Sequence, residues 1–294
     1  MSTTTRTGGF PVGFRRGWSE WQKDLPALAG WAKANGFGAI DLTGGKTTPA
    51  EIKTLKDAGL RVGSVDIPDW SLLMSKDAAK RKDAVQKIAA FVKDLVEHGA
   101  RAFFTVAMPE DKASPIAENF KLAVEGYGAL GREIDGTGAR IVFEGWPGGG
   151  SHVACNPETT RALFKETGCK ALGVNYDPSH LIRMGIDHLR FLREFADRVG
   201  HVHAKDTEIF PEAIYEVGHE QGSAFEKAHG FGRHTWRYTI PGHGEARWKA
   251  IFRILEQAKF GGAVCVELED ENFNGSEQGE KDALLASRDY LKYA

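Results

Sequence analysis

Four polar side chains that can bind a metal ion stand at the ends of four apolar segments in the second half of the chain. Each segment begins with apolar or β-branched residues, and the four end residues are Glu144, Asp177, His203 and Glu267. Two glutamates, one aspartate and one histidine form a hard, oxygen-rich ligand set that suits Mn²⁺, Mg²⁺, Co²⁺, Fe²⁺ or Zn²⁺. These residue types predict one divalent-metal site built from distant parts of the sequence.

Each of these residues on its own also has an ordinary structural explanation. Glu144 can be a solvated strand end, Asp177 before Pro178 can cap a turn, and His203 can be a buried core histidine. Glu267 can pair with a nearby arginine. The metal site is inferred from the four residues together, because each of them stands at the end of a strand-like segment in its own unit of the chain. Carboxylates brought together without a cation would repel one another, and a divalent ion removes that repulsion.

The sequence HVHAKD carries further polar groups with the spacing of a strand. Residues two apart share one face of a strand, so His201, His203 and Lys205 point the same way. Near the mouth of a barrel, His203 can bind the ion while Lys205 reaches towards a substrate. Lys205 can equally be a side chain whose stem is buried and whose head is in water. His180, three residues after Asp177, falls at a turn where it can contact a substrate hydroxyl.

The segments that carry these residues alternate with helical segments. Runs that are apolar without strict alternation are typical of parallel strands covered on both faces. Strands are expected at 10–14, 38–42, 61–68, 101–108, 139–146, 171–180, 199–206 and 261–270. Helices are expected at 23–35, 49–59, 77–98, 115–135, after Asn156-Pro157, and at 187–198, 248–259 and 280–293. This alternation predicts an α/β fold, a single (β/α)₈ TIM barrel over residues 1–294, with its active site at the carboxyl ends of the strands.

Two segments do not fit this repeat. Residues 1–9 are rich in threonine and glycine, and we expect them to be disordered. Residues 207–238 show no clean period and follow the seventh strand, so we expect a long insertion there that acts as a lid on the active-site face. The segment 238–248, with the sequence YTIPGHGEARW, is also strand-like and leads into the eighth strand.

Composition excludes several classes of protein. The contents of 41% hydrophobic and 27% charged residues are those of a globular protein, and a net charge of −2 argues against a general nucleic-acid binder. No apolar run is long enough for a membrane span, and the N-terminus has no signal-peptide core, which makes the cytoplasm the expected location. Cys155, Cys169 and Cys265 are too widely spaced for a disulfide framework or a zinc knuckle. The glycine run 148–150 does not match a phosphate-binding motif, and assembly as a homo-oligomer is left open.

With these motifs the chain resembles the xylose-isomerase-like barrels known as sugar-phosphate isomerases/epimerases, which include the tagatose/psicose 3-epimerases and the inosose dehydratases. The similarity is strongest from Ile141 to Asp270. The motifs that carry it are Glu144, Asp177-Pro178-Ser179-His180, His201-Val202-His203, Pro241-Gly242-His243-Gly244, Trp248 and Glu267. The resemblance implies that Glu144, Asp177, His203 and Glu267 hold the ion, usually Mn²⁺, with His180 near the substrate.

The chain departs from the ketose 3-epimerases at two positions. Those enzymes place a second glutamate six residues after the first ligand and an arginine six residues after the ligand histidine, where this chain has Gly150 and Ile209. The residues expected to contact substrate in their place are Trp146, His152, Arg183 and Lys205. The insertion and the VELED ending are more similar to a sub-group associated with keto-sugar and glycoside breakdown, which includes lyases.

The expected function is a metal-dependent isomerase or epimerase that acts on a small, unphosphorylated carbohydrate through an enediolate. The alternative is a metal-dependent lyase or dehydratase of a keto-sugar or keto-glycoside. Glu144, Glu267, His180 and Lys205 are expected to take part in catalysis, with Glu267 as the base and His180, His152 or Lys205 as alternatives. A DNA-repair nuclease of the same superfamily would need a basic surface, and a non-catalytic sensor would tolerate loss of the four ligands. Aromatic residues near strand ends, which can stack on a sugar or pack in the core, are Phe14, Trp18, Trp70 and Trp146.

Overall fold

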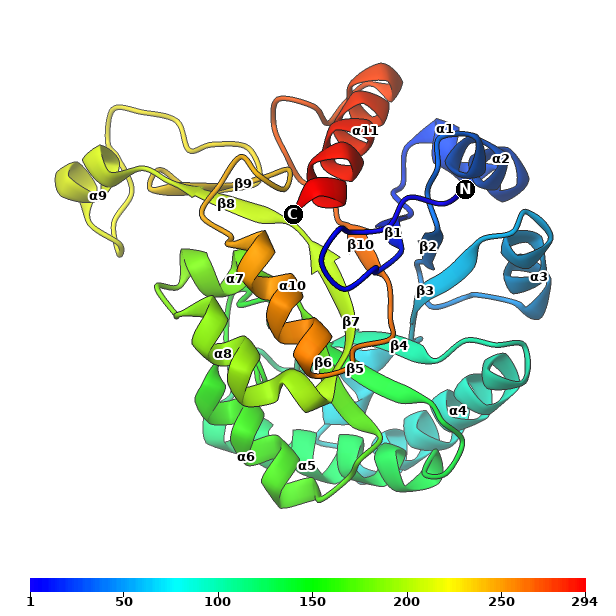
Figure 1. Cartoon of the computed structure of the whole chain (residues 1–294). Coiled ribbons are helices and arrows are strands. Elements are labelled where there is room, and N and C mark those ends of the chain that lie inside the picture. Colours follow the sequence, from blue (N-terminus) through cyan, green and yellow to red (C-terminus); the bar gives the residue numbers. More distant parts are fainter.

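A closed barrel of parallel strands organises the chain (Figure 1). A computed structural model describes residues 1–294. The barrel strands are β1 (Val12–Arg15), β2 (Ala39–Leu42), β3 (Arg61–Asp66), β4 (Ala102–Val106), β5 (Arg140–Glu144), β6 (Leu172–Tyr176), β7 (Val199–Ala204) and β10 (Val264–Val266). Their order around the barrel is β1-β10-β7-β6-β5-β4-β3-β2. The predicted (β/α)₈ TIM barrel is confirmed.

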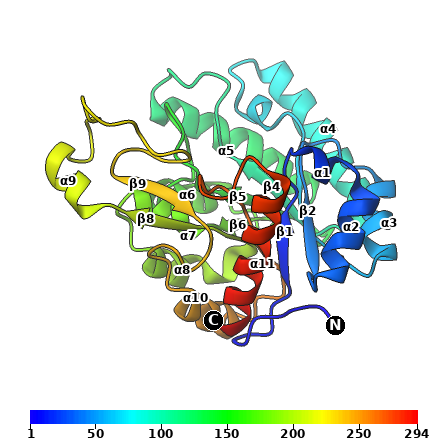
Figure 2. The ribbon, with the colours of Figure 1, turned by 90° about the horizontal axis from the view of Figure 1, so that it is seen from above.

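Helices lie outside the strands and connect them (Figures 1 and 2). They are α1 (Glu20–Lys23), α2 (Leu25–Ala34), α3 (Pro49–Asp57), α4 (Ala78–Glu97), α5 (Ile116–Glu133), α6 (Pro157–Thr167), α7 (Pro178–Arg183), α8 (His188–Phe195), α9 (Pro211–Val217), α10 (Trp248–Gln257) and α11 (Glu277–Tyr293). Short 3₁₀ turns are η1 (Trp70–Met74) and η2 (Ala196–Arg198). No helix is long and apolar enough to cross a membrane.

The helix starts follow local sequence signals. Thr48 and Glu51 form a reciprocal capping box at the start of α3, with Pro49 in the first turn. The helix expected at 23–35 is instead divided into α1 and α2. The Asp24 side chain accepts a hydrogen bond from Ala27 N at 3.1 Å and so starts a new helix, in which Pro26 can only occupy the first turn.

The barrel interior is polar where the strands approach the active-site face. Asp41 on β2 contacts His201 on β7 at 3.1 Å, although these strands are not neighbours in the sheet, so the contact crosses the interior. Both side chains are fully buried. The main apolar core, a cluster of 59 buried residues that includes Phe143 and Trp248, joins the strands to the surrounding helices. Apolar packing therefore stabilises the shell, while the interior contains buried charged groups.

The N-terminal segment differs from the expected disorder. Gly8 and Gly9 have φ angles of +80° and +63°, which turn the chain back so that Thr5 N donates to Phe10 O at 2.9 Å. Arg6 N donates to Lys292 O at 2.9 Å, which joins the segment to the end of α11. These backbone hydrogen bonds place residues 1–9 beside the C-terminus.

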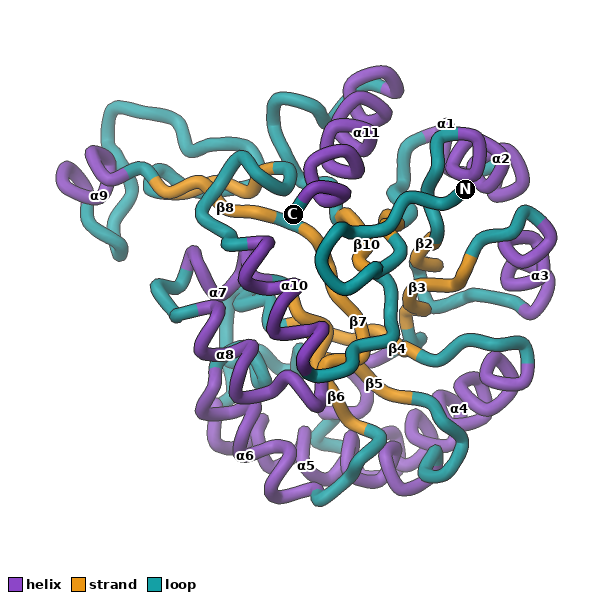
Figure 3. Tube along the Cα trace, in the orientation of Figure 1, coloured by secondary structure: helices purple, strands orange, loops and turns teal.

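The segment 207–238 contains more regular structure than its sequence indicates. Strand β8 (Asp206–Ile209) pairs antiparallel with β9 (Trp236–Thr239), and α9 lies in the connection between them. Figure 3 shows this ribbon and its long loops projecting from the barrel. The strand-like segment 238–248 therefore contributes only its first residues to a strand, and that strand belongs to the ribbon.

The remainder of that segment forms a turn around Asp206. The Asp206 carboxylate accepts hydrogen bonds from Gly242 N at 3.1 Å, Ala246 N at 2.8 Å and Trp248 Nε1 at 3.3 Å. A Cβ atom on Gly244 would lie only 2.4 Å from the backbone oxygen of Thr207, so this position requires glycine. This motif, which contributed to the family resemblance, fixes the ribbon to the barrel.

Candidate metal centre

The four predicted ligands meet at the carboxyl end of the barrel. Glu144 ends β5, Asp177 follows β6, His203 lies near the end of β7 and Glu267 follows β10. Each offers one donor atom, and these atoms all lie within 4.8 Å of one another. Residues separated by up to 123 positions in the sequence thus form one cluster because parallel strands direct their carboxyl ends to the same face.

The two glutamates of this cluster are held as carboxylates. Glu144 Oε2 lies 2.6 Å from His203 Nδ1 and accepts from Asn175 Nδ2 at 2.8 Å. Burial and the charge of Glu267 raise the pKa of Glu144, but His203 and His180 outweigh them and hold that pKa well below its usual range. For Glu267, burial raises the pKa, whereas Lys205, His203 and Arg15 lower it well below the usual range. Both side chains are therefore negatively charged at neutral pH.

Asp177 provides the test of whether a cation fits. Its Oδ1 accepts from Ser179 N at 2.8 Å and caps α7, whereas its Oδ2 is buried and accepts no hydrogen bond. Its ion-pair contacts are longer, with Lys205 Nζ at 3.3 Å and His180 Nε2 at 3.4 Å. Buried polar atoms nearly always accept a hydrogen bond, so this oxygen is available to bind a cation. The charge and donor types of this cluster suit a divalent ion, and the residues present therefore fit one.

Lys205 lies against the ligands. Its Nζ donates to Glu267 Oε2 at 2.5 Å and to Glu269 Oε2 at 3.0 Å, and lies 3.3 Å from Asp177 Oδ2. Burial lowers the pKa of Lys205, but these carboxylates raise it well above its usual value. The side chain is a buried ammonium ion. The alternative that its head lies in water is therefore wrong.

His180 is fully buried and both of its ring nitrogens are engaged. Nε2 lies 3.0 Å from Glu144 Oε1, and Nδ1 lies 2.7 Å from the hydroxyl of Tyr238 on β9. Tyr238 also lies under Lys205 Nζ, 4.5 Å from the ring centroid. His180 therefore orients Glu144, and the ribbon reaches the centre through Tyr238, a residue that our sequence reasoning did not identify.

The other residues expected at the substrate site gather around the loop after β5. His152 Nδ1 lies 3.1 Å from the backbone oxygen of Trp146, and the two rings pack edge to face at 5.3 Å. Arg183 donates to the backbone oxygen of Pro147 at 3.0 Å and lies over the ring of Trp236. His152 Nε2 is buried without a partner. The structure thus brings Trp146, His152 and Arg183 together on one side of the barrel mouth.

Sequence reasoning missed Arg15 and Asp66. Arg15 makes two hydrogen bonds to Asp66, at 2.8 and 3.0 Å, and its Nε lies 3.3 Å from Glu267 Oε1. Both residues end barrel strands, as the four ligands do, so the same criterion applied to β1 and β3 would have found them. Asp66 holds Arg15, and Arg15 fixes the orientation of Glu267. The alternative that Glu267 pairs with a nearby arginine is thus also seen in the structure.

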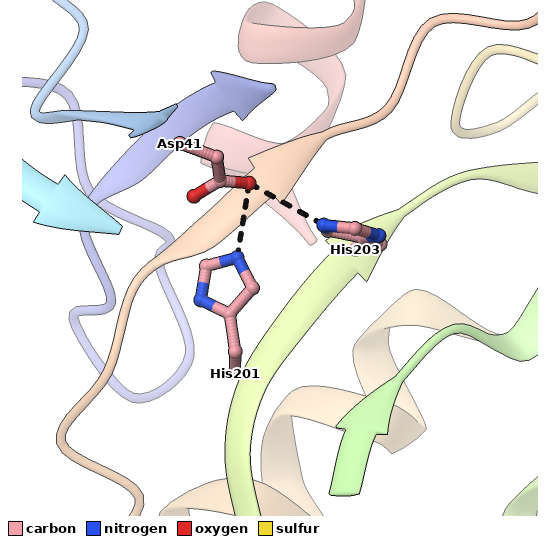
Figure 4. A group of neighbouring side chains, drawn as sticks. All are labelled: Asp41, His201 and His203. Carbon is pink, nitrogen blue, oxygen red and sulfur yellow. Dashed lines mark hydrogen bonds and ion pairs between the residues drawn. The ribbon is translucent and has the colours of Figure 1, made fainter. Parts of the chain in front are cut away.

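Asp41 contacts both His203, the predicted histidine ligand, and His201 (Figure 4). Its Oδ2 is 3.4 Å from His203 Nε2 and 3.1 Å from His201 Nε2, and its Oδ1 accepts from Ser64 N at 2.8 Å. The contact with His201 is a hydrogen bond, and the longer contact with His203 is an ion pair. A carboxylate beside one nitrogen of a histidine helps to orient the ring so that its other nitrogen can bind a metal. Asp41 thereby presents His203 Nδ1 towards Glu144.

We expect the Asp41→Asn variant to bind Mn²⁺ about 10- to 100-fold more weakly than the wild type, because loss of such an outer partner typically has that effect. Isothermal titration calorimetry on the folded proteins measures the affinity directly. Ser64→Ala is the matched control, since it keeps the backbone N–H that Asp41 uses. Equal Mn²⁺ affinities of wild type and Asp41→Asn would contradict this positioning role.

Comparison with known families agrees with this geometry. Residues 29–293 match the model of the xylose isomerase-like TIM barrel. The chain belongs to this family. The chain is 29% identical over 245 residues to an inosose dehydratase of Geobacillus thermodenitrificans. The alignment covers 77% of this chain and 76% of that enzyme. The resemblance inferred from its motifs is confirmed.

Two solved structures show the same fold. A D-psicose 3-epimerase studied in the presence of D-fructose superposes with a TM-score of 0.70 at 16% identity, covering 95% of this chain and 97% of that one. The IOLI protein with a bound zinc atom superposes with a TM-score of 0.66 at 14% identity, covering 96% of both chains. Because the sequence identities are this low, the two superpositions show a shared fold and nothing more specific.

Proposed function

We propose that this protein is a divalent-metal-dependent isomerase or epimerase that acts on a small carbohydrate through an enediolate. The observation that carries the proposal is the cluster of Glu144, Asp177, His203 and Glu267 at the carboxyl end of the barrel. Mn²⁺ is the proposed ion. When bound, such an ion polarises a carbonyl group and stabilises the negative charge that develops on its oxygen.

Glu267 is the member of the cluster placed to act on substrate. Its side chain is 15% exposed, whereas those of Glu144, Asp177 and His203 are 5%, 0% and 0% exposed. Glu267 therefore removes the proton from the carbon next to the carbonyl. The electron pair of that C–H bond forms a C=C bond, and the π electrons of the carbonyl group move onto its oxygen. Return of the proton to the other face gives an epimer, and its return to the neighbouring carbon gives an isomer.

Lys205 and Arg15 assist this transfer. The Lys205 ammonium contacts Glu267 Oε2 and Arg15 contacts Glu267 Oε1, so the base is held in one orientation. Lys205 is surrounded by three carboxylates, which favours its ammonium form, so it donates hydrogen bonds and does not act as the base. We further propose that the segment 207–238 acts as a lid, since its Tyr238 closes one side of the centre.

The second candidate is a lyase or dehydratase of a keto-sugar or keto-glycoside. The inosose dehydratase similarity favours it, as does Gly150 in place of a second catalytic glutamate. The first step is the same, but the enediolate then expels an oxygen substituent from the next carbon. That leaving group departs as an alcohol or water after it gains a proton.

Proton NMR in D₂O with the Mn²⁺-loaded protein and a panel of ketoses and 3-keto-glycosides tests the proposal. We expect deuterium to enter a retained C–H position as an epimer or isomer appears, because the abstracted proton exchanges with solvent. Loss of a hydroxyl or glycosidic group would instead establish the lyase. Absence of both exchange and product across the panel would contradict the proposed function.

A further inference from the structure

A cleft of about 420 Å³ opens beside the metal centre. It is lined by Glu267, Glu269 and Arg15 at its inner end and by residues of the loops after β1 and β10 further out. Ligand sites typically have volumes of about 300–1,000 Å³. The reacting carbon must lie at Glu267, so a substrate that reaches this residue can extend into the remainder of the cleft.

Two exposed aromatic residues line this cleft. Trp18 is 74% exposed and Phe231 is 45% exposed, and they come from distant parts of the sequence. Single exposed aromatic residues are ordinary on protein surfaces. Two that line the same cleft beside a reactive carboxylate form an apolar surface on which a ring can stack, because aromatic faces attract C–H groups and other rings.

Phe231 is held there at a conformational cost. Its φ angle is +53°, in the left-handed region that bulky residues rarely adopt. The neighbouring backbone is fixed, because Gly230 N donates to Glu271 Oε2 at 2.7 Å and Tyr238 N donates to Phe231 O at 3.0 Å. Strained backbone that its surroundings hold in place is typical of ligand-binding positions.

Trp18 is also held by a fixed support. Buried Glu280 on α11 accepts hydrogen bonds from Ser19 Oγ at 2.6 Å, Trp21 Nε1 at 2.7 Å and Gln22 Nε2 at 3.1 Å. These bonds fix the loop that carries Trp18. They also occupy the polar side chains of Ser19, Gln22 and Glu280 in the cleft wall, so the part of the wall beside Trp18 offers a ring mainly a stacking contact.

We infer that this cleft is an outer subsite for a ring attached to the reacting sugar, so that the substrate is a glycoside and not a free monosaccharide. This inference rests on the proposed function, because the reacting sugar must lie at the metal centre. The attached ring can be a second sugar or an aryl group, since both stack on Trp18 and Phe231. The subsite thus gives specificity for the leaving or retained aglycone.

The test compares methyl, phenyl and glucosyl 3-keto-β-D-glucosides as substrates of the Mn²⁺-loaded protein. We expect kcat/KM for the phenyl or glucosyl compound to exceed that of the methyl compound by at least about tenfold, as two stacking contacts supply. Whichever compound shows the larger ratio identifies the kind of ring. In Trp18→Ala and Phe231→Ala each, the ratio should fall by about 3- to 10-fold.

Phe225→Ala is the matched control. Phe225 belongs to the same segment as Phe231 and is 98% exposed, but it does not line the cleft. The ratio of kcat/KM for the phenyl or glucosyl compound to that for the methyl compound should be the same in Phe225→Ala as in the wild type. Turnover of the methyl compound with a ratio near one, unchanged in Trp18→Ala and Phe231→Ala, would overturn the subsite and leave the proposed function standing.

If no glycoside reacts, the kinetic ratio cannot be measured and binding alone decides the subsite, whereas the proposed function is decided separately with the free ketoses. Saturation-transfer NMR with phenyl β-D-glucoside then provides the measurement. Signals from the phenyl protons that disappear in a Trp18→Ala/Phe231→Ala double variant would support the subsite. Absence of these signals in the wild-type protein would overturn it.

Discussion

Replacement of His203 by alanine is expected to lower kcat/KM by about 10²–10³-fold while the barrel remains folded. His203 Nδ1 lies 2.6 Å from Glu144 Oε2 and 3.5 Å from Glu267 Oε2, so it is the one nitrogen donor among three carboxylates. Without it the ion is held loosely, and the stabilisation of developing negative charge is lost, which commonly costs about 10²–10³-fold. Removal of the metal from the wild type should have the same effect.

The measurement combines turnover, bound metal and folding in one series. Circular dichroism establishes that the His203→Ala protein is folded, and His203→Gln provides a second variant that fills more of the buried space. His98→Ala, at the exposed end of α4, is the control and should behave as the wild type. Undiminished turnover in a folded His203 variant, or in metal-free protein, would show that the cluster is not a catalytic metal centre.

Replacement of Lys205 by methionine is expected to lower turnover by about 10²–10⁴-fold and yet to strengthen metal binding. The two effects have opposite signs because Lys205 does two things. Its ammonium holds Glu267 for proton transfer, but it also lies 3.3 Å from Asp177 Oδ2 and repels any cation that approaches the same oxygens. Methionine removes this repulsion together with the donor.

The same substitution should destabilise the metal-free protein by about 3–5 kcal/mol, because it leaves buried carboxylates without their cation. Mn²⁺ should recover much of this loss, since a ligand that binds the folded state stabilises it. Thermal unfolding with and without Mn²⁺ measures both quantities. Lys53→Met removes an exposed pair with Asp57 and should change stability by no more than about 0.5 kcal/mol. Metal affinity that falls together with turnover would refute the proposed role of Lys205.

The barrel could be predicted because its signals are local. Apolar runs, proline at helix starts and capping residues such as Thr48 depend on neighbours within a few positions, and the structure retains them. The division at Asp24 was missed because a short capping signal competed with a continuous apolar pattern. The ribbon β8–β9 was missed because its strands are short and separated by a long connection that carries no period.

The sequence by itself determined which residue types end the barrel strands, and from that the four residues whose donor atoms gather in the candidate metal centre. It did so because a parallel barrel always directs those ends to one face. Only the tertiary structure decided how the side chains are oriented there. Asp41 reaches His203 across the barrel, Tyr238 reaches His180 from the ribbon, and Lys205 turns towards Glu267. These contacts join residues that are distant in sequence, and no local pattern specifies the distance between them.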